Sequence, residues 1–357
     1  MQLTYWKVAL PFEYPFTISG NRSKTEQPAL VVCLSDQGLD GYGEAPAIRY
    51  YHVEPDVLAA ALEEKREVIE ATALKHPQTL YALWLELFAE HPFLVCALDM
   101  ATWDWYGKSK QQTVAQLMGA LSHAQVPSTD YTLGIDAPAV MLEKMRARPW
   151  PVYKVKVGFN GDLELIDELL ANSQSRFRLD ANGGWSESEA LDKLNKLNKQ
   201  RIEFVEQPIA PEQTQAQRML FEQSPLPLLA DESCVSEADV DRCAGLFHGI
   251  NIKLTKCGGI TPARRMIERA RLLGLQVMMG SMNESSIGTA AIAAFVGLLD
   301  HVDMDGPLLL RGDYARGLQL LPQQTIVEGS SGLGVTVYRD QLTKHRIEPN
   351  RSRSGLV

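Results

Sequence analysis

The sequence predicts an α/β protein in which a (β/α)8-type barrel follows an α+β domain. Short apolar runs that resemble buried strands recur at intervals of about 21 to 27 residues from the middle of the chain onward. Amphipathic segments such as LELIDELLANSQ and TPARRMIERARLLG fill these intervals. Roughly the first 120 residues follow a different pattern, in which strand-like runs come first and helical runs come after them.

The first domain is predicted over residues 1–122. Its strands are LTYWKVAL and ALVVCLSD, and the turn DQGLDG leads into YGEA. The stretches VLAAALEEKREVIEATAL and FLVCALDMATWDWYGKSKQQTVAQLMG have the periodicity of helices.

The barrel is predicted over residues 123–306. Its strands are expected to begin near Thr129, Tyr153, Arg176, Glu203, Leu228, Gly249, Gln276 and His301. Residues 307–357 contain a further possible strand and are expected to pack back on the first domain. A doubly wound open sheet is the structural rival, but it requires a glycine-rich phosphate loop after its first strand. GYGEAP lacks the third glycine and no helix follows it at once, so the barrel is favoured.

Composition limits the partners and the compartment. The chain of 357 residues has 35 basic and 44 acidic side chains and a formal net charge of −9, which argues against nucleic acid or an anionic membrane as the main partner. No apolar run reaches the ~18 residues of a membrane-spanning helix, and no signal peptide is evident. Five cysteines without a CxxC pair are expected to be reduced thiols of a cytoplasmic protein. Barrels of this kind often associate, so the sequence is compatible with a homo-oligomer.

Charged residues interrupt the apolar runs where the barrel strands should end. Ionised groups in such runs are costly to desolvate unless they are paired, bound to metal or used in chemistry. They are Lys154, Lys156, Asp180, Glu206, Asp231, Lys253, Asp303 and Asp305. Because carboxyl ends of the strands form the active-site face of such barrels, these side chains are expected to share one site.

Asp180, Glu206 and Asp231 come from the third, fourth and fifth barrel strands. Three converging carboxylates repel each other unless a hard divalent cation neutralises them, and a set of oxygen ligands suits Mg²⁺. The alternative is that they are separate acidic caps of helix N-termini.

Two lysines are predicted to face each other across the barrel mouth. Side chains alternate along a strand, so Lys154 and Lys156 share one face, as do Asn251 and Lys253. The second and sixth of eight strands lie opposite each other, which places Lys156 across from Lys253. One lysine would remove an α-proton from a metal-held carboxylate substrate and the other would protonate the opposite face. Nearby cations and the metal are expected to lower the pKa values of both lysines. Solvated strand ends are the alternative.

Asp303 and Asp305 lie on the eighth strand and are expected across the pocket, far from the metal. Two inward carboxylates there would hold a cationic group, so a substrate with a carboxylate at one end and an ammonium at the other fits a dipeptide. The alternative is that one of them forms a salt bridge with a barrel lysine.

Taken together, the ordered motifs resemble the enolase superfamily and, within it, the muconate-lactonizing-like subgroup. They cover almost the whole chain and are GYGEAP, ALDMATWDW, KVKVG, LDANGGW, EQP, ADES, NIKLTKCGG, GSMNES and DMDGP. The DxD pair of the eighth strand is similar to that of the dipeptide epimerases of the L-Ala-D/L-Glu epimerase type. The resemblance implies an enolase-like, modified TIM barrel with a capping domain.

The resemblance also implies roles for individual residues. Asp180, Glu206 and Asp231 would bind Mg²⁺, and Lys156 and Lys253 would be the two acid/base residues. The substrate-binding residues would include Lys154, which supports the substrate carboxylate, and Asp303 and Asp305, which bind the ammonium, together with Thr132, Ser281 and Met282 in the pocket wall.

Specificity in this family comes from two loops of the capping domain, here near Thr17–Thr25 and Ile48–His52. A relative that acts on Ala-Glu would place an arginine in the first loop, but this chain has Asn21 at that spacing, with Arg22 next and Lys24 beyond. Arg22 and Tyr51 are candidate substrate contacts. Solvated loop charges and a packed lid are the alternatives.

These observations predict a Mg²⁺-dependent dipeptide epimerase that inverts the α-carbon of the C-terminal residue by two-base 1,1-proton transfer through a metal-stabilised enolate. The alternative enzymes are an N-acylamino acid racemase, an o-succinylbenzoate synthase or a cycloisomerase, which the two aspartates of the eighth strand disfavour. A non-catalytic binding protein on this scaffold would have lost a lysine or a ligand, and none is lost.

Overall fold

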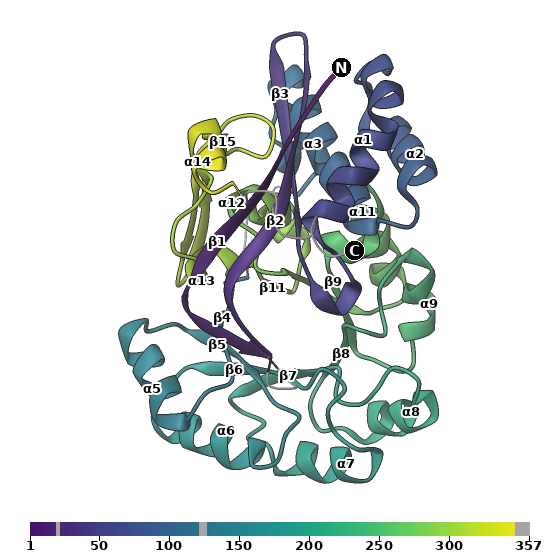
Figure 1. The fold of residues 1–357 in the computed structure, drawn as a ribbon. Helices are drawn as coiled ribbons and strands as arrows, with labels where there is room; N and C mark the ends of the chain where they lie inside the picture. Colours follow the sequence, from purple (N-terminus) through teal and green to yellow (C-terminus); the bar gives the residue numbers. More distant parts are fainter. Residues whose placement is uncertain (19–21, 121–126, 347–357) are drawn as a thin grey trace, which may run out of the picture.

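The structure is a computed structural model that describes residues 1–18, 22–120 and 127–346. An antiparallel sheet and a helical layer form its N-terminal part, and a parallel barrel forms the rest (Figure 1). In the described ranges no helix is long and apolar enough to cross a membrane.

The N-terminal sheet has the order β1-β2-β3, and its strands run far down the molecule toward the barrel (Figure 1). Its strands are β1 (Gln2–Ile18), β2 (Arg22–Asp36) and β3 (Leu39–Pro46), and its helices are η1 (Arg49–Tyr51), α1 (Pro55–Ala71), α2 (Pro77–Phe88), α3 (Pro92–Lys110) and α4 (Val114–Met118). Helix α3 packs directly on β3, where a Cβ at Gly41 or Gly43 would collide with the carbonyl oxygens of Ala101 and Ala97. This close approach requires glycine at both positions.

The barrel sheet contains eight parallel strands in the order β11-β10-β9-β8-β7-β6-β5-β4. They are β4 (Tyr131–Leu133), β5 (Val152–Lys156), β6 (Arg176–Asp180), β7 (Ile202–Glu206), β8 (Leu228–Ala230), β9 (Gly249–Ile252), β10 (Gln276–Gly280) and β11 (His301–Asp303). A parallel bridge between Thr129 and Val302 joins the two outer strands, so the sheet is nearly closed. The predicted fold class and strand order are confirmed, and each strand begins within two residues of its predicted start.

Helices cover the outside of the barrel, and α5 to α8 form its outer rim in Figure 1. The helices that follow the strands are α5 (Pro138–Ala147), α6 (Asp162–Ala171), α7 (Glu187–Lys196), α8 (Thr214–Gln223), η2 (Glu237–Asp239), α9 (Val240–Cys243), α10 (Leu254–Cys257), α11 (Ile260–Leu272), α12 (Ser286–Ala293), η3 (Val296–Leu298) and α13 (Gly306–Leu309).

The C-terminal segment lies against β1. It contains β12 (Ala315–Arg316), β13 (Leu318–Leu321), β14 (Gln324–Val327), β15 (Thr336–Val337) and α14 (Arg339–Lys344). The N–H of Ala9 donates to the carbonyl of His345 at 3.0 Å, and Arg339 pairs with Asp40 at 2.8 Å.

Two buried carboxylates attach the N-terminal layer to the barrel. Asp99 of α3 accepts bonds from the N–H and hydroxyl of Thr261, both at 2.8 Å, at the start of α11. Glu44 of β3 accepts from the N–H and hydroxyl of Ser285 at 3.1 and 2.6 Å, before α12. Burial raises the pKa of each carboxyl to about 7. Because both helices follow carboxyl ends of barrel strands, these bonds hold the N-terminal layer over that face.

Candidate active site

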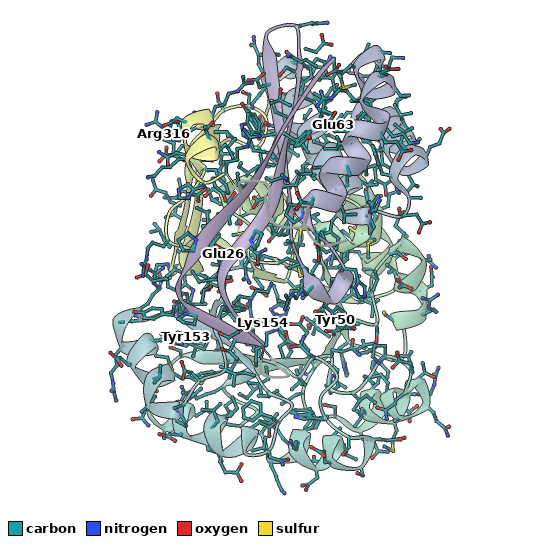
Figure 2. The ribbon with its side chains drawn as sticks, viewed as in Figure 1. Glu26, Tyr50, Glu63, Tyr153, Lys154 and Arg316 are labelled. Atoms are coloured by element: carbon teal, nitrogen blue, oxygen red, sulfur yellow. The ribbon has the colours of Figure 1, made fainter. Side chains whose placement is uncertain are left out.

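A cavity of about 230 Å³ lies between the N-terminal layer and the barrel mouth. Figure 2 labels one residue from each side, Tyr50 of the N-terminal part and Lys154 of the barrel. The residues that line it are Phe16, Lys24, Ile48, Tyr50, Tyr51, Thr132, Lys154, Lys156, Asn182, Asp231, Glu232, Lys253, Ser281, Met282, Asn283 and Asp303.

The structure brings together the three predicted metal ligands. Asp180 ends β6, Glu206 ends β7 and Asp231 directly follows β8, and each offers a carboxylate oxygen within 4.8 Å of the other two. All three are buried. The next helices are capped by other residues, Ser186 for α7 and Ser236 for η2, so the helix-cap alternative does not hold for Asp180 and Asp231.

The surroundings shift the pKa values of these carboxyl groups in opposite directions. Burial raises the pKa of Glu206 to about 7, and the charge of Asp180 adds to the rise. Burial also acts on Asp180, but Lys156 and Lys154 outweigh it and bring its pKa to about 2. Oε2 of Glu206 lies 2.8 Å from Nζ of Lys154 and accepts no well-oriented hydrogen bond from the described residues. A buried set of three carboxylates in which one oxygen of Glu206 accepts no hydrogen bond fits a hard divalent cation.

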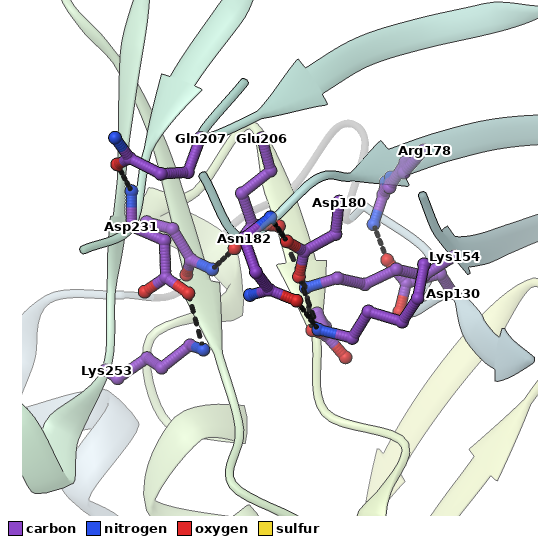
Figure 3. Close-up of polar contacts among 12 residues, drawn as sticks. Asp130, Lys154, Arg178, Asp180, Asn182, Glu206, Gln207, Asp231 and Lys253 are labelled. Atoms are coloured by element: carbon purple, nitrogen blue, oxygen red, sulfur yellow. Dashed lines mark hydrogen bonds and ion pairs between the residues drawn. The ribbon is translucent and has the colours of Figure 1, made fainter. Parts of the chain in front are cut away.

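The two predicted acid/base lysines lie on β5 and directly after β9, four strands apart in the sheet order. Nζ of Lys156 donates to Oδ2 of Asp180 at 2.6 Å, and Nζ of Lys253 donates to Oδ2 of Asp231 at 2.8 Å (Figure 3 shows the second bond). Both lysines line the cavity. Burial is the largest single influence and lowers the pKa of Lys253, but the charges of Asp231, Glu206 and Asp180 together outweigh it and raise this pKa. The nearby cation Lys154 lowers this pKa as expected, and the further lowering by the metal stays a prediction.

Lys154 links the metal cluster to the eighth strand. Its Nζ lies 3.1 Å from Oδ2 of Asp180, 2.8 Å from Oε2 of Glu206 and 2.9 Å from Oδ2 of Asp303. The expectation that Asp303 lies far from the metal cluster is wrong, because one ammonium contacts carboxylates of both groups. The alternative in which an eighth-strand aspartate pairs with a barrel lysine is the observed arrangement for Asp303.

Asp305, unlike Asp303, is not among the residues that line the cavity. Strand β11 ends at Asp303, and Asp305 is the N-cap residue of α13. Its Oδ2 accepts a hydrogen bond from the N–H of Thr132 at 2.5 Å, and its side chain is buried. The two aspartates therefore differ, since Asp303 reaches the cavity and Asp305 lies behind it.

Most of the remaining residues that were predicted for the pocket line the cavity. Thr132, Ser281, Met282 and Tyr51 all line it. The ring centroid of Tyr51 lies 4.9 Å from that of Tyr50 and 5.6 Å from that of Phe93 in α3, so this loop is packed against the helical layer. The Arg22 side chain lies outside the described residues, and the first loop contributes Lys24 to the wall.

Sequence reasoning missed several polar residues of the site. Asn182 accepts from Lys156 at 3.1 Å and donates to Glu232 at 3.1 Å. Lys256 donates to the Asp231 carboxylate at 2.5 Å, which gives this carboxylate a second lysine partner. Asn182 follows the strand-end residue Asp180 by two positions in LDAN, and Lys256 follows Lys253 by three positions in NIKLTK. This closeness in sequence is the signal that could have identified both residues.

The fold and the site define an enzyme of the enolase superfamily. The chain belongs to its mandelate racemase and muconate lactonizing enzyme family. Residues 1–119 match the model described as mandelate racemase / muconate lactonizing enzyme, N-terminal domain, and residues 139–341 match the model described as enolase C-terminal domain-like. The protein is an isomerase of this family.

Among its relatives is an L-Ala-D/L-amino acid epimerase from Flavobacterium johnsoniae, 40% identical over 94% of this chain and 100% of the relative. A hydrophobic dipeptide epimerase from Flavobacteria bacterium is 34% identical over 94% of this chain and 97% of the relative. Among solved structures, a dipeptide epimerase from Cytophaga hutchinsonii, complexed with Mg and the dipeptide D-Ala-L-Val, has a TM-score of 0.89. It is 25% identical and the match covers 96% of this chain and 97% of that chain.

Proposed function

We propose that the protein is a Mg²⁺-dependent dipeptide epimerase that inverts the α-carbon of the C-terminal residue. The observation that carries the proposal is one cavity that is lined by two lysines from opposite strands, by an aspartate of the eighth strand and by Asp231, one member of the carboxylate triad. The names of the relatives and the dipeptide in the similar solved structure agree with it. A cytoplasmic location and a homo-oligomer remain predictions.

Asp180, Glu206 and Asp231 would hold the Mg²⁺ ion. When bound, the ion supplies positive charge that stabilises the negative charge developing on the substrate carboxylate. Lys154 adds a fixed ammonium beside this position, because it contacts Asp180 and Glu206 directly.

Proton transfer would use Lys156 and Lys253. The lysine in its neutral form takes the α-proton from one face, and the opposite lysine gives a proton to the other face, which inverts the centre. The hydrogen bonds to Asp180 and Asp231 orient the two Nζ atoms. The walls formed by Tyr50, Tyr51 and Met282 would limit the access of water to the carbanion.

Incubation with L,L-dipeptides in D₂O and Mg²⁺ is expected to exchange the α-proton of the C-terminal residue and to produce the L,D diastereomer. The panel should include L-Ala-L-Leu, L-Ala-L-Glu and L-Ala-L-Gln, and mass spectrometry with chiral analysis measures both products. N-succinyl amino acids serve as the comparison. Exchange confined to the N-succinyl compounds would contradict the proposal and favour the racemase alternative.

Lys24 is expected to determine part of the side-chain preference. It lines the cavity from β2, and in the described part of the chain it forms no ion pair. Burial and the charge of Arg49 lower its pKa, and an anionic substrate group beside it would offset both effects and favour the charged form of Lys24. Lys24→Met should lower kcat/KM for L-Ala-L-Glu about tenfold and leave L-Ala-L-Gln within about twofold, because the amide lacks the charge. An equal change of kcat/KM for both dipeptides would show that Lys24 does not distinguish a charged side chain from a neutral one.

A further inference from the structure

A second cluster of buried carboxylates lies where the two outer strands of the barrel meet. Asp130, Asp303 and Asp305 each offer an oxygen within 4.8 Å of the other two. Asp130 directly precedes β4, beside the bridge between Thr129 and Val302. Its side chain is 0% exposed, and sequence reasoning did not single it out.

Only one carboxylate oxygen of Asp130 has a hydrogen-bond partner among the described residues. Its Oδ2 accepts from Nη1 of Arg178 at 2.8 Å, as Figure 3 shows. Arg178 also donates to the carbonyl of Val302 at 2.7 Å and to Oε2 of Glu203 at 2.7 Å, so its position is fixed from three sides. Oδ1 of Asp130 has no hydrogen-bond partner among the described residues. A buried carboxylate oxygen without a partner is costly, so each such oxygen requires an explanation.

The cluster also lacks positive charge. Lys154 contacts Asp303 but is shared with Asp180 and Glu206, and Arg178 is shared with Glu203. Asp305 accepts from a backbone N–H, and no cation within the described ranges pairs with it. Burial and the charge of Asp303 raise the pKa of Asp305 to about 7, and the same two causes raise the pKa of Asp130 well above its usual range. Three carboxylates held this closely are stabilised by a further cation, and the cavity reaches Asp303.

We propose that Asp130 is a positioning residue of the subsite for the substrate's α-ammonium group, which it serves by supporting Asp303 and Asp305 from behind. Arg178 anchors Asp130. A cation at Asp303 favours the ionised form of Asp130, whose charge then strengthens the attraction of the cluster for an ammonium ion at Asp303. Asp130 does not touch the substrate. The inference rests on the proposed dipeptide epimerase function and names a residue that this function does not require by itself.

The test compares a dipeptide with an analogue that lacks only the amine. Asp130→Asn keeps an acceptor for Arg178 and removes the charge. KM for L-Ala-L-Leu is expected to rise about tenfold with kcat within about threefold, since a charge that binds the ground state and the transition state equally affects KM alone. The inhibition constant of N-propionyl-L-leucine, measured against L-Ala-L-Leu, should stay within about twofold, because this analogue has no ammonium group.

Glu143→Gln, which removes an exposed carboxylate of α5, is the matched control and should leave both constants unchanged. Asp130→Ser is the second variant if Asp130→Asn does not fold, and the same split between the two constants is expected. Equal changes of KM and of the inhibition constant, or no change in either, would overturn the role of Asp130. Failure of the wild-type protein to turn over any dipeptide would instead overturn the proposed function.

Discussion

Replacing Lys253 by alanine is expected to reduce net epimerisation by about 10³-fold or more, and Lys156→Ala should do the same. General acid–base groups contribute about 10² to 10⁴ in rate, and a two-base inversion requires both of them in every turnover. The two lysines come from strands four positions apart, and each is hydrogen-bonded to a different carboxylate of the cluster. Neither is therefore placed to replace the other.

Isotope exchange separates this mechanism from a general loss of structure. In D₂O each single variant should still exchange the α-proton of one diastereomer, the one whose proton faces the remaining lysine, and the two variants should act on opposite diastereomers. Lys196→Ala, on the exposed face of α7, is the control and should retain full activity. Exchange of both diastereomers by either variant would contradict the two-base assignment.

The order of the barrel could be predicted because its signals are local. Each strand is a short apolar run followed by an amphipathic helix. This sequence pattern repeats along the chain and can be recognised without knowing which strands pair. The charged strand ends could be predicted for the same reason. Asp180 and Glu206 end strands of matching register in a parallel sheet, so their proximity follows from the fold alone.

Contacts that depend on how the barrel closes could not be predicted in the same way. Asp130 lies in TDYTL, a candidate strand start, but its partners are on β6 and near β11, far away in sequence. The link from Asp303 through Lys154 to the metal cluster likewise requires the lengths of three side chains, not only the position of their strands. The first cap loop lacks periodicity, and spacing alone did not show that Lys24 lines the cavity.

Glu206→Gln is expected to weaken the affinity for Mg²⁺ by about 100-fold or more and to abolish activity. The amide is nearly isosteric, but it removes one of three charges that attract a hard cation. Thermal unfolding with and without Mg²⁺ measures binding independently of activity. For the wild type, Mg²⁺ at a hundred times its Kd should stabilise the fold by about 2.7 kcal/mol, because a ligand that binds only the folded state shifts the equilibrium toward it.

The variant should show almost no Mg²⁺-dependent shift in Tm, whereas Glu212→Gln, in the exposed loop after β7, should shift like the wild type. In EDTA near pH 8, Glu206→Gln should be at least as stable as the wild type. Burial raises the pKa of Glu206 to about 7 in the folded protein, so the ionised carboxylate opposes folding above that pH, and a neutral amide removes this cost. A variant that is less stable in EDTA and still responds to Mg²⁺ would show that Glu206 is a structural partner of Lys154 and Asn251 and not a metal ligand.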